Sequence, residues 1–210
     1  MEITIPLGSD CCVAYQMKEH GIRIASYPFD WCRSSIQQLI QCIIDDFKIF
    51  QTLDIGTRSN LHPEIDEDGN LLSGGSFIVK NGYEMLLAHE LTSTDKLEHY
   101  RSRINDRITR FRMALNDTSR CIHFIRKESA KIKKSYIEHL VKLIELLPSH
   151  CKLSLVVHSS SREFLKHLED QYIGKLRIIY YQDFSKDWRC CHLDWDTIFA
   201  WPESPEQPAP

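Results

Sequence analysis

Hydrophobic residues recur along this chain with two periods, one typical of buried strands and one typical of amphipathic helices. In the second half, apolar runs of strand length alternate with longer segments in which apolar residues return every three or four positions. The predicted strands span 121–126, 152–158 and 175–181, and the predicted helices span about 129–147 and 162–171. Such alternation over short connections is typical of a parallel sheet covered by helices.

The first half opens with a β-branched strand at 3–5, which a Gly-Ser-Asp turn at 8–10 separates from a first helix. A second helix follows Ser34 or Ser35, and either serine can cap it. Its apolar residues have the spacing of one buried helix face, and they are Ile36, Leu39, Ile40, Ile43, Ile44 and Phe47. The second helix is therefore expected to pack against the core.

A β-hairpin is predicted at 76–89, because two strand-like runs flank Asn81-Gly82, a pair typical of type I′ turns. The segment before it, 54–75, is rich in turn residues and is expected to be an exposed loop or irregular hairpin.

A long helix is expected after Asp95. Its arginines are Arg101, Arg103, Arg107, Arg110 and Arg112. We interpret them as a solvated face that pairs with neighbouring acids, the commoner role of such a set.

These elements predict an α/β fold in which a twisted, largely parallel sheet is covered by helices and carries the hairpin as an antiparallel addition. The first strand belongs to the same sheet. Residues 1–201 are expected to form a single domain, since a chain of this length can bury a sizeable core. Residues 202–210 contain four prolines and are expected to form a disordered tail.

Composition narrows the classes of partner and compartment. The 210 residues carry a formal net charge of −3, which gives no general attraction to nucleic acid or anionic membranes. The N-terminus lacks the basic and apolar regions of a signal peptide, and no apolar run reaches the roughly 18 residues that span a bilayer. The eight cysteines are therefore expected to be reduced thiols in the cytoplasm. Secretion into a host cell without a cleavable signal would leave no trace in this sequence.

Cys11 is the main candidate for chemistry, because the predicted turn places it at the start of a helix and beyond the carboxyl end of a strand. The helix dipole and the N–H groups there stabilise a thiolate, so the pKa of Cys11 is expected to fall below about 8.5. The alternative is a packed thiol, since free cysteines are commonly buried. Helix periodicity does not let Cys11 and Cys12 face the same way, and the turn alone leaves both interpretations open.

Several short motifs occur together in the first 31 residues. They are Leu-Gly-x-x-Cys-x-x-Ala at 7–14, a glycine and basic segment at 21–23 and Pro-Phe-Asp-Trp at 28–31. Looser matches are His89-Glu90 after the hairpin and the arginine-rich segment 103–111. This pattern resembles a family of bacterial and viral proteins of unknown function that is assigned to the papain-like cysteine peptidases.

The resemblance implies that Cys11 is a nucleophile and His89 its base, in acyl transfer to or hydrolysis of protein or peptide substrates. It also implies a thioester intermediate, with the oxyanion bound by N–H groups at the helix start. A third group would orient the imidazole. We favour Asp30 over Glu90, although Asp30 could instead cap a turn or pair with an arginine. The secondary candidates in the same motifs are Ser9, Asp10 and Trp31.

Other functions stay open, because a papain fold sets its cysteine helix against an antiparallel barrel and not in a wound α/β layer. A glycosyl-type or other group transferase is the alternative enzyme. The turn at 8–10 lacks the glycine patterns of dinucleotide and phosphate loops, and we expect no cofactor. The remaining alternative is a non-catalytic effector or binding module in which Cys11 is merely packed.

A metal site is not expected. Cys190-Cys191-His192 is the densest group of metal-ligating residue types, but structural zinc sites usually use two spaced pairs of ligands. No such double pair occurs in the sequence, and adjacent cysteines chelate poorly. We therefore assign this group to packing of the C-terminal segment.

Overall fold

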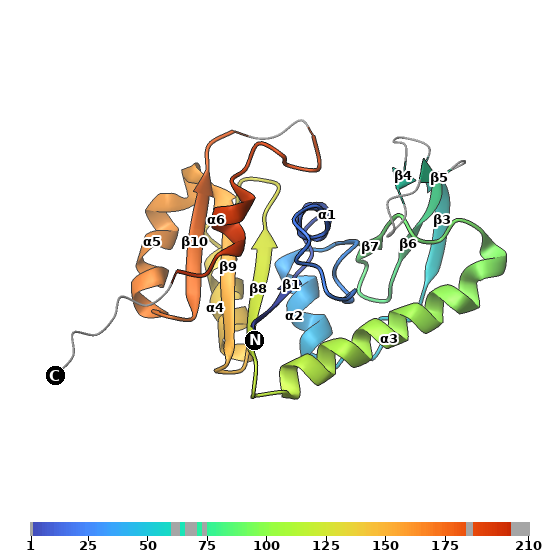
Figure 1. The fold of residues 1–210 in the computed structure, drawn as a ribbon, viewed down its shortest axis with the longest axis horizontal. Helices are drawn as coiled ribbons and strands as arrows, with labels where there is room; N and C mark the ends of the chain where they lie inside the picture. The colour runs from blue at the N-terminus through green and yellow to red at the C-terminus, as the bar shows by residue number, and fades with distance from the viewer. Residues whose placement is uncertain (1, 60–63, 66–70, 73–74, 184–186, 203–210) are drawn as a thin grey trace.

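A parallel sheet of four strands forms the centre of the molecule, with strand order β1-β8-β9-β10 (Figure 1). The structure is a computed structural model that describes residues 2–59, 64–65, 71–72, 75–183 and 187–202. The four strands are β1 (Glu2–Pro6), β8 (Cys121–Lys127), β9 (Cys151–His158) and β10 (Leu176–Tyr181). All three pairings are parallel, so the predicted α/β fold class is confirmed. The predicted disordered tail lies outside the described residues beyond Pro202.

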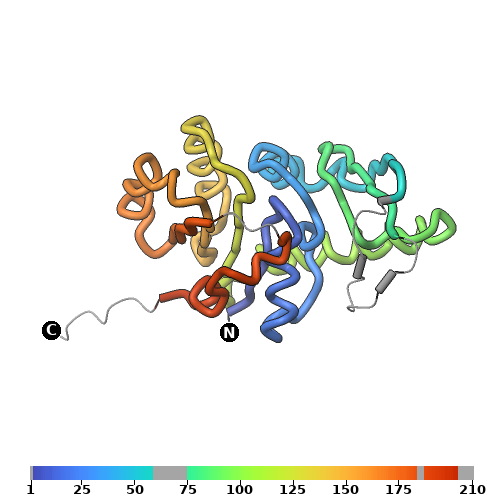
Figure 2. Tube along the Cα trace, turned by 90° about the horizontal axis from the view of Figure 1, so that it is seen from above, coloured from blue at the N-terminus to red at the C-terminus, as the bar shows by residue number. Residues whose placement is uncertain are grey.

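Helices cover both faces of this sheet. The two sides are visible in Figure 2, with α2 (Ile36–Ile44), α4 (Tyr136–Leu146) and α5 (Arg162–Gln171) on one side and α1 (Cys12–Glu19) and α6 (Trp195–Phe199) on the other. Successive strand residues face opposite ways, which explains why both faces are apolar. In β8, Phe124 packs in the core cluster of α2, α4 and α5, whereas Ile125 packs in the cluster of α1 and α6.

A second, antiparallel sheet lies beside the first, with strand order β2-β7-β6-β3. Its strands are β2 (Cys32–Arg33), β7 (Leu86–Leu87), β6 (Ser76–Lys80) and β3 (Asp54–Ser59). A further pair joins β4 (Glu64–Ile65) to β5 (Leu71–Leu72). The long helix α3 (Leu97–Asn116), which a 3₁₀ turn at Thr94–Lys96 precedes, runs from beneath this sheet back to β8 (Figure 1).

The predicted hairpin forms, but it belongs to the second sheet and not to the parallel one. Lys80 pairs with Leu86, so the loop holds five residues where the Asn-Gly pair predicted two. The Asn81 side chain explains this, because its Oδ1 accepts hydrogen bonds from the backbone N–H groups of Tyr83 (3.0 Å) and Met85 (3.1 Å). The residue with positive φ is Glu84, at 59°.

Two further predictions need correction. Residues 54–75 were expected to form an exposed loop or irregular hairpin. β4 and β5 pair antiparallel within this segment, but residues 54–59 form β3 and pair with β6, with an irregularity between Ile55 and Arg58. Turn-rich composition concealed a strand that a partner 17 to 26 residues away stabilises. The fourth helix begins at Tyr136 and not near residue 129, because residues 129–135 connect β8 to it without regular structure.

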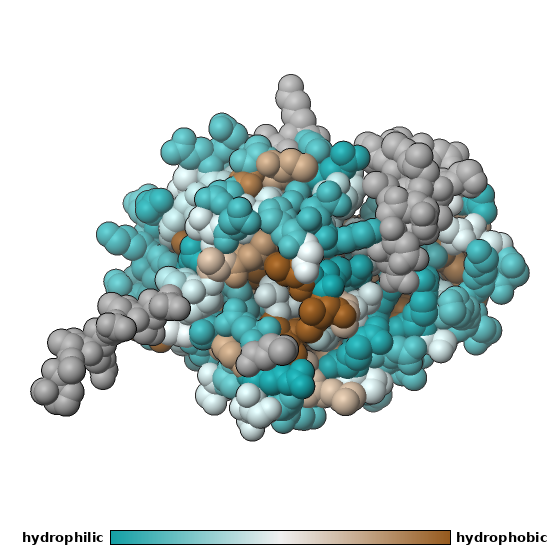
Figure 3. Space-filling model, in the orientation of Figure 1, coloured by the Kyte–Doolittle hydropathy of each residue, from teal (hydrophilic) through white to brown (hydrophobic). Residues whose placement is uncertain are grey.

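The two sheets share one apolar core, with Phe111 of α3 at its centre. The Phe111 ring lies 5.5 Å from Phe29, 5.4 Å from Phe47 and 5.9 Å from Phe124 between ring centroids. At the surface, one face is hydrophilic around its edge and shows apolar side chains in its middle (Figure 3). Among the described residues, no helix is long and apolar enough to cross a membrane.

Candidate active site

The turn between β1 and α1 places Cys11 just beyond the carboxyl end of the parallel sheet. Gly8 and Ser9 both have positive φ, at 68° and 77°. Glycine is also required at position 8 by space, because a Cβ there would lie 2.7 Å from Ser34 Oγ. The Asp10 carboxylate accepts a hydrogen bond from the Cys12 N–H (3.0 Å), and α1 begins at Cys12 with Cys11 as its N-cap.

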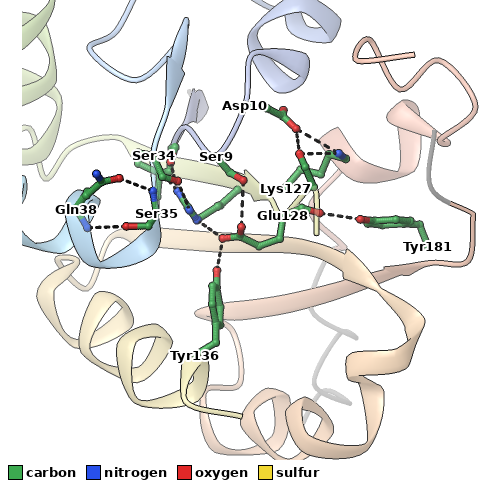
Figure 4. A network of polar contacts seen from close by, with 12 residues as sticks. Ser9, Asp10, Ser34, Ser35, Gln38, Lys127, Glu128, Tyr136 and Tyr181 are labelled. Carbon is green, nitrogen blue, oxygen red and sulfur yellow. Dashed lines mark hydrogen bonds and ion pairs between the residues drawn. The ribbon is translucent and has the colours of Figure 1, made fainter. Parts of the chain in front are cut away.

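A buried polar network holds this turn (Figure 4). The Glu128 carboxylate accepts hydrogen bonds from Ser9 Oγ (3.0 Å), Arg126 Nε (2.6 Å) and Tyr136 OH (2.6 Å). Arg126 is fully buried and donates to the carbonyl oxygens of Leu7 (2.7 Å) and Ser34 (2.8 Å). Arg126 and Glu128 therefore hold Leu7 before the turn and Ser9 within it, and Arg126 ties both to Ser34.

Asp10, a secondary candidate, belongs to a neighbouring group of polar contacts. Its Oδ2 lies 3.3 Å from Lys127 Nζ and accepts a hydrogen bond from Ser129 Oγ (Figure 4). Lys127 is itself 5% exposed, so Asp10 neutralises a buried ammonium group. These contacts and the bond to the Cys12 N–H give Asp10 a role in shaping the turn.

Cys11 is half-buried, and its ionisation differs from the sequence-based expectation. Burial raises the pKa of the Cys11 thiol well above its ordinary value, and the charges of Asp10 and Glu90 raise it further. Arg33 acts in the opposite direction but does not compensate. The predicted lowering was wrong because loss of water around the sulfur outweighs the helix dipole. At neutral pH the group in this arrangement is a thiol and needs a base to react.

His89 lies at the end of the second sheet that faces α1. β2 and β7 pair so that the Ala88 N–H donates to the Trp31 carbonyl (3.1 Å), and the His89 N–H donates to Ser76 Oγ (3.1 Å). His89 has positive φ, at 70°, which is uncommon for a residue with a side chain. Its ring lies 5.7 Å from Trp31 in an edge contact and 5.9 Å from Trp188 in a stacked contact.

The same aromatic group reaches the helix of Cys11. Trp188 makes an edge contact with Tyr15, with ring centroids 5.2 Å apart. Tyr15 lies one turn after Cys11 on α1, and its N–H donates to the Cys11 carbonyl (3.1 Å). Glu90, which follows His89, is close enough for its charge to act on Cys11. The structure thus brings the segments of Cys11, Trp31 and His89 to one region between the two sheets.

The two candidate orienting carboxylates both have arginine partners. Asp30 is 1% exposed, and its Oδ2 accepts hydrogen bonds from Arg23 Nη2 (2.7 Å) and Nε (3.2 Å). Burial still raises the pKa of Asp30 to about 6. Glu90 Oε1 lies 2.5 Å from Arg107 Nη2, and its Oε2 accepts from Arg107 Nη1 at 2.8 Å. Pairing with an arginine, which the sequence left open for Asp30, therefore holds for both.

A small cavity lies beside this ion pair. Its lining residues are Pro28, Trp31, Phe50, Leu87, Glu90, Tyr100, Ile104 and Arg107. The volume open to the centre of a water-sized sphere is about 10 Å³, room for about one water molecule. The cavity is too small for a substrate, so it belongs to the packing behind Trp31.

Cys190, Cys191 and His192, which were assigned to packing of the C-terminal segment, contact different partners. Cys190 is 3% exposed and packs in the same cluster as Cys12, and its contacts with Cys12 and Lys127 lower its pKa to about 7. Cys191 Sγ accepts from Gln16 Nε2 (3.5 Å), and His192 Nε2 lies 3.0 Å from the Asp183 carbonyl. Within the described residues, no group of three His, Cys, Asp or Glu side chains could hold a metal ion.

Sequence reasoning missed Glu128, Arg126 and Trp188. Glu128 and Arg126 belong to the end of a strand, where charged residues are usually solvated, and only the fold shows that they hold the turn at 8–10. Trp188 lies in a segment assigned to packing, about 100 residues from His89 in sequence. The one signal available for Arg126 and Glu128 was the run of three charged residues at 126–128, which ends a mostly apolar strand.

The comparisons with known proteins agree with the motifs in the first third of the chain. A family model described as "Putative papain-like cysteine peptidase (DUF1796)" matches residues 2–160. The "Uncharacterized protein R408" of Acanthamoeba polyphaga mimivirus is 25% identical over 214 residues, which cover 92% of this chain and 95% of the viral protein. No solved structure matches the chain at a significant level.

Proposed function

The chain belongs to the DUF1796 family, and on that premise we propose that it is a cysteine hydrolase or acyltransferase of protein or peptide substrates, with Cys11 as nucleophile and His89 as base. One observation carries the proposal. The turn after β1 places Cys11 at the start of α1, and Trp188 contacts both Tyr15 of that helix and the His89 ring. Ligands and reacting groups commonly gather at that edge of open α/β sheets.

The raised pKa of Cys11 defines what His89 must do. In the first step, His89 takes the proton from Cys11 Sγ as the sulfur attacks the substrate carbonyl carbon. The tetrahedral intermediate expels the leaving amine, which receives that proton from the imidazolium, and a thioester remains on Cys11. Water or a second amine then attacks the thioester, with His89 again as base. Hydrolysis releases the acid, and aminolysis gives the transferase product.

The oxyanion site is expected at the start of α1, where N–H groups lack partners inside the helix. The Cys12 N–H already donates to Asp10, so the donors have to be other N–H groups of the same turn. Asp10 and Glu128 keep that turn in place, which supports preorganisation of the site. Asp10 bonds the Cys12 N–H and Glu128 bonds the Ser9 hydroxyl, so we assign both carboxylates to holding the turn.

Asp30 stays our candidate for the orienting group. Asp30 lies two residues before β2 and His89 two residues after β7, at the ends of two strands that pair with each other. Asp30 Oδ1 is buried without a hydrogen-bond partner among the described residues, although Oδ2 is bound to Arg23. A free acceptor oxygen suits an imidazole N–H. Glu90 is the weaker candidate, since Arg107 contacts both of its oxygens.

Hydrolysis of p-nitrophenyl acetate tests the proposal without knowledge of the natural substrate. Cys11→Ala and His89→Ala are each expected to lower the rate at least about a hundredfold, the usual contribution of a nucleophile or base. Cys121→Ala is the matched control. Cys121 is also half-buried, but it lies at the amino end of β8, whereas Cys11 follows the carboxyl end of β1. His167→Ala, an exposed histidine of α5, is the second control. Equal rates in wild type and Cys11→Ala would contradict the proposal and favour a transferase of another class or a binding module.

A further inference from the structure

The C-terminal segment supplies a stacked ring contact to His89. The His89 and Trp188 rings are 5.9 Å apart between centroids and inclined by only 23°, so the indole covers one face of the imidazole. Trp31 meets the same imidazole edge-on, at 5.7 Å and 71°. A ring held between a stacked partner and an edge partner has little freedom to turn about its side-chain bonds.

The segment of Trp188 is also bonded to α1, the helix of Cys11. Gln16 is 3% exposed, and its Nε2 donates to the Arg189 carbonyl at 2.7 Å. Cys190 packs in the buried cluster of Cys12, and the Trp195 Nε1–H donates to the Cys190 carbonyl at 2.9 Å. The two residues that follow Trp188 are therefore bonded to α1 and to Trp195.

Charge adds to the stacked arrangement. The Arg189 guanidinium lies 5.8 Å from the ring centroids of both Trp188 and Tyr15, which braces the two rings together. This contact helps to hold the Trp188 ring in the orientation in which it stacks on His89.

From this geometry we propose that Trp188 is a positioning residue for His89, which keeps the imidazole aimed at Cys11 from the C-terminal segment. The inference rests on the proposed function of Cys11 and His89. Trp188 lies beyond residues 2–160, so the family match carries no information about it. Trp188 is not placed in contact with the reacting atoms and acts through the histidine.

A double-mutant cycle on the rate at which iodoacetamide alkylates Cys11 tests this inference. The variants are wild type, Trp188→Ala, His89→Ala and the double variant, read at about pH 7 by mass spectrometry of the Cys11 peptide. Trp188→Ala is expected to slow alkylation about tenfold in the wild-type background, the equivalent of a contact of about 1.4 kcal/mol. In the His89→Ala background the same change is expected to have no effect, because its route through His89 is gone.

Two further variants separate positioning from general damage. Trp188→Phe is expected to keep most of the rate, since a phenyl ring also offers a face to the imidazole. Trp201→Ala is the matched control, because Trp201 makes an edge contact with another histidine, His123, at 5.2 Å, and is expected to change nothing. If Trp188→Ala slows alkylation of Cys11 both with and without His89, Trp188 has only a structural role. If it speeds alkylation in both cases, Trp188 only shields Cys11 from the reagent. Either result overturns the inference.

Failure of the inference and failure of the proposed function give different results. If Cys11 reacts no faster in wild type than in His89→Ala, the proposed function fails. The inference then fails too, because Trp188 has no effect of His89 through which to act. Where Cys11 depends on His89 but Trp188→Ala changes neither background, the proposed function stands and only the inference is overturned.

Discussion

His123 is a buried histidine at the centre of the parallel sheet. Its Nε2 lies 2.7 Å from Ser154 Oγ, its ring meets Trp201, and its Nδ1 lies 3.6 Å from a Glu2 carboxylate oxygen. Burial lowers the pKa of His123 to about 4, and the charges of Arg177 and Lys152 act in the same direction. The imidazole is therefore neutral in the folded protein at pH values where the unfolded chain binds a proton.

This shift predicts a loss of stability in acid. Between an unfolded pKa of about 6.5 and the folded value of about 4, the unfolded chain binds more protons, so the free energy of unfolding decreases as the pH falls. Over this whole pH range, the pKa shift of His123 changes the free energy of unfolding by about 3 kcal/mol. His123→Gln is expected to reduce the difference in urea stability between about pH 7.5 and about pH 4.5. The exposed control is His167→Gln. A difference as large as in that control would contradict the assignment.

Single residues also mark where sequence reasoning stopped. The motif identified Cys11 as the candidate nucleophile, but the sign of its pKa shift depends on how much water the fold removes from the sulfur. Likewise, no local pattern shows that Asp30 meets Arg23 or that Glu90 meets Arg107 across 17 residues. Partners of buried charges are set by tertiary packing, which short motifs do not encode.

At the scale of elements, the start of α2 offers a direct test of capping. Ser35 Oγ accepts from the Gln38 N–H (3.2 Å), and Gln38 Oε1 accepts from the Ser35 N–H (2.8 Å), a reciprocal capping box. Ser35→Ala is expected to lower the free energy of unfolding by about 1 kcal/mol, measured by urea denaturation. Ser35→Asp, which keeps an acceptor, is expected to retain most of it. Equal losses in both variants would argue against the cap.

The turn between β1 and α1 predicts a larger effect at Glu128. Glu128→Gln would leave the fully buried Arg126 guanidinium without its anionic partner, so we expect a loss on the order of 3 kcal/mol in urea unfolding. Tyr136→Phe removes one hydrogen bond to the same carboxylate and is expected to cost about 1 kcal/mol. The account of the network fails if Glu128→Gln costs no more than Tyr136→Phe.

Element boundaries were predictable where local signals dominate. The strands that became β8, β9 and β10 and the capped helix α2 follow from runs of apolar residues, period and one serine. The segment that became β3 was missed because its partner is β6 and its own composition is that of a turn. The hairpin loop was predicted too short because the Asn81 side chain, and not the Gly82 backbone, organises it.

At the scale of the whole molecule, one apolar cluster contains Val79 and Leu87 of the second sheet as well as Phe124 of the parallel sheet. Phe111 belongs to this cluster and is fully buried, so Phe111→Ala is expected to lower the free energy of unfolding by about 3–5 kcal/mol. Because both sheets share this cluster, unfolding followed by tryptophan fluorescence and by far-ultraviolet circular dichroism should give one midpoint. Two separate midpoints in the wild type would show that the sheets unfold independently.

The arrangement of the sheets shows the limit of local prediction. The parallel sheet was predictable from alternating elements, because right-handed strand–helix–strand units leave few topologies. The second sheet was not, since it combines two-residue strands with a segment read as a loop. The two main residues of the candidate site, Cys11 and His89, were predicted from short motifs. The residues around them could not be predicted, because they come from segments that only the fold brings together.

The central claim is that Cys11 reacts because His89 takes its proton. The most direct test is to find which residue is acylated by an activated ester. Wild type, His89→Ala and Cys121→Ala would be mixed briefly with p-nitrophenyl acetate, quenched in acid and mapped by mass spectrometry. The account predicts an acetyl group on the Cys11 peptide in wild type and Cys121→Ala, and its loss in His89→Ala. Cys190, whose pKa of about 7 is lower than that of Cys11, is the informative rival. Acetylation at Cys190, or at Cys11 regardless of His89, would contradict the account.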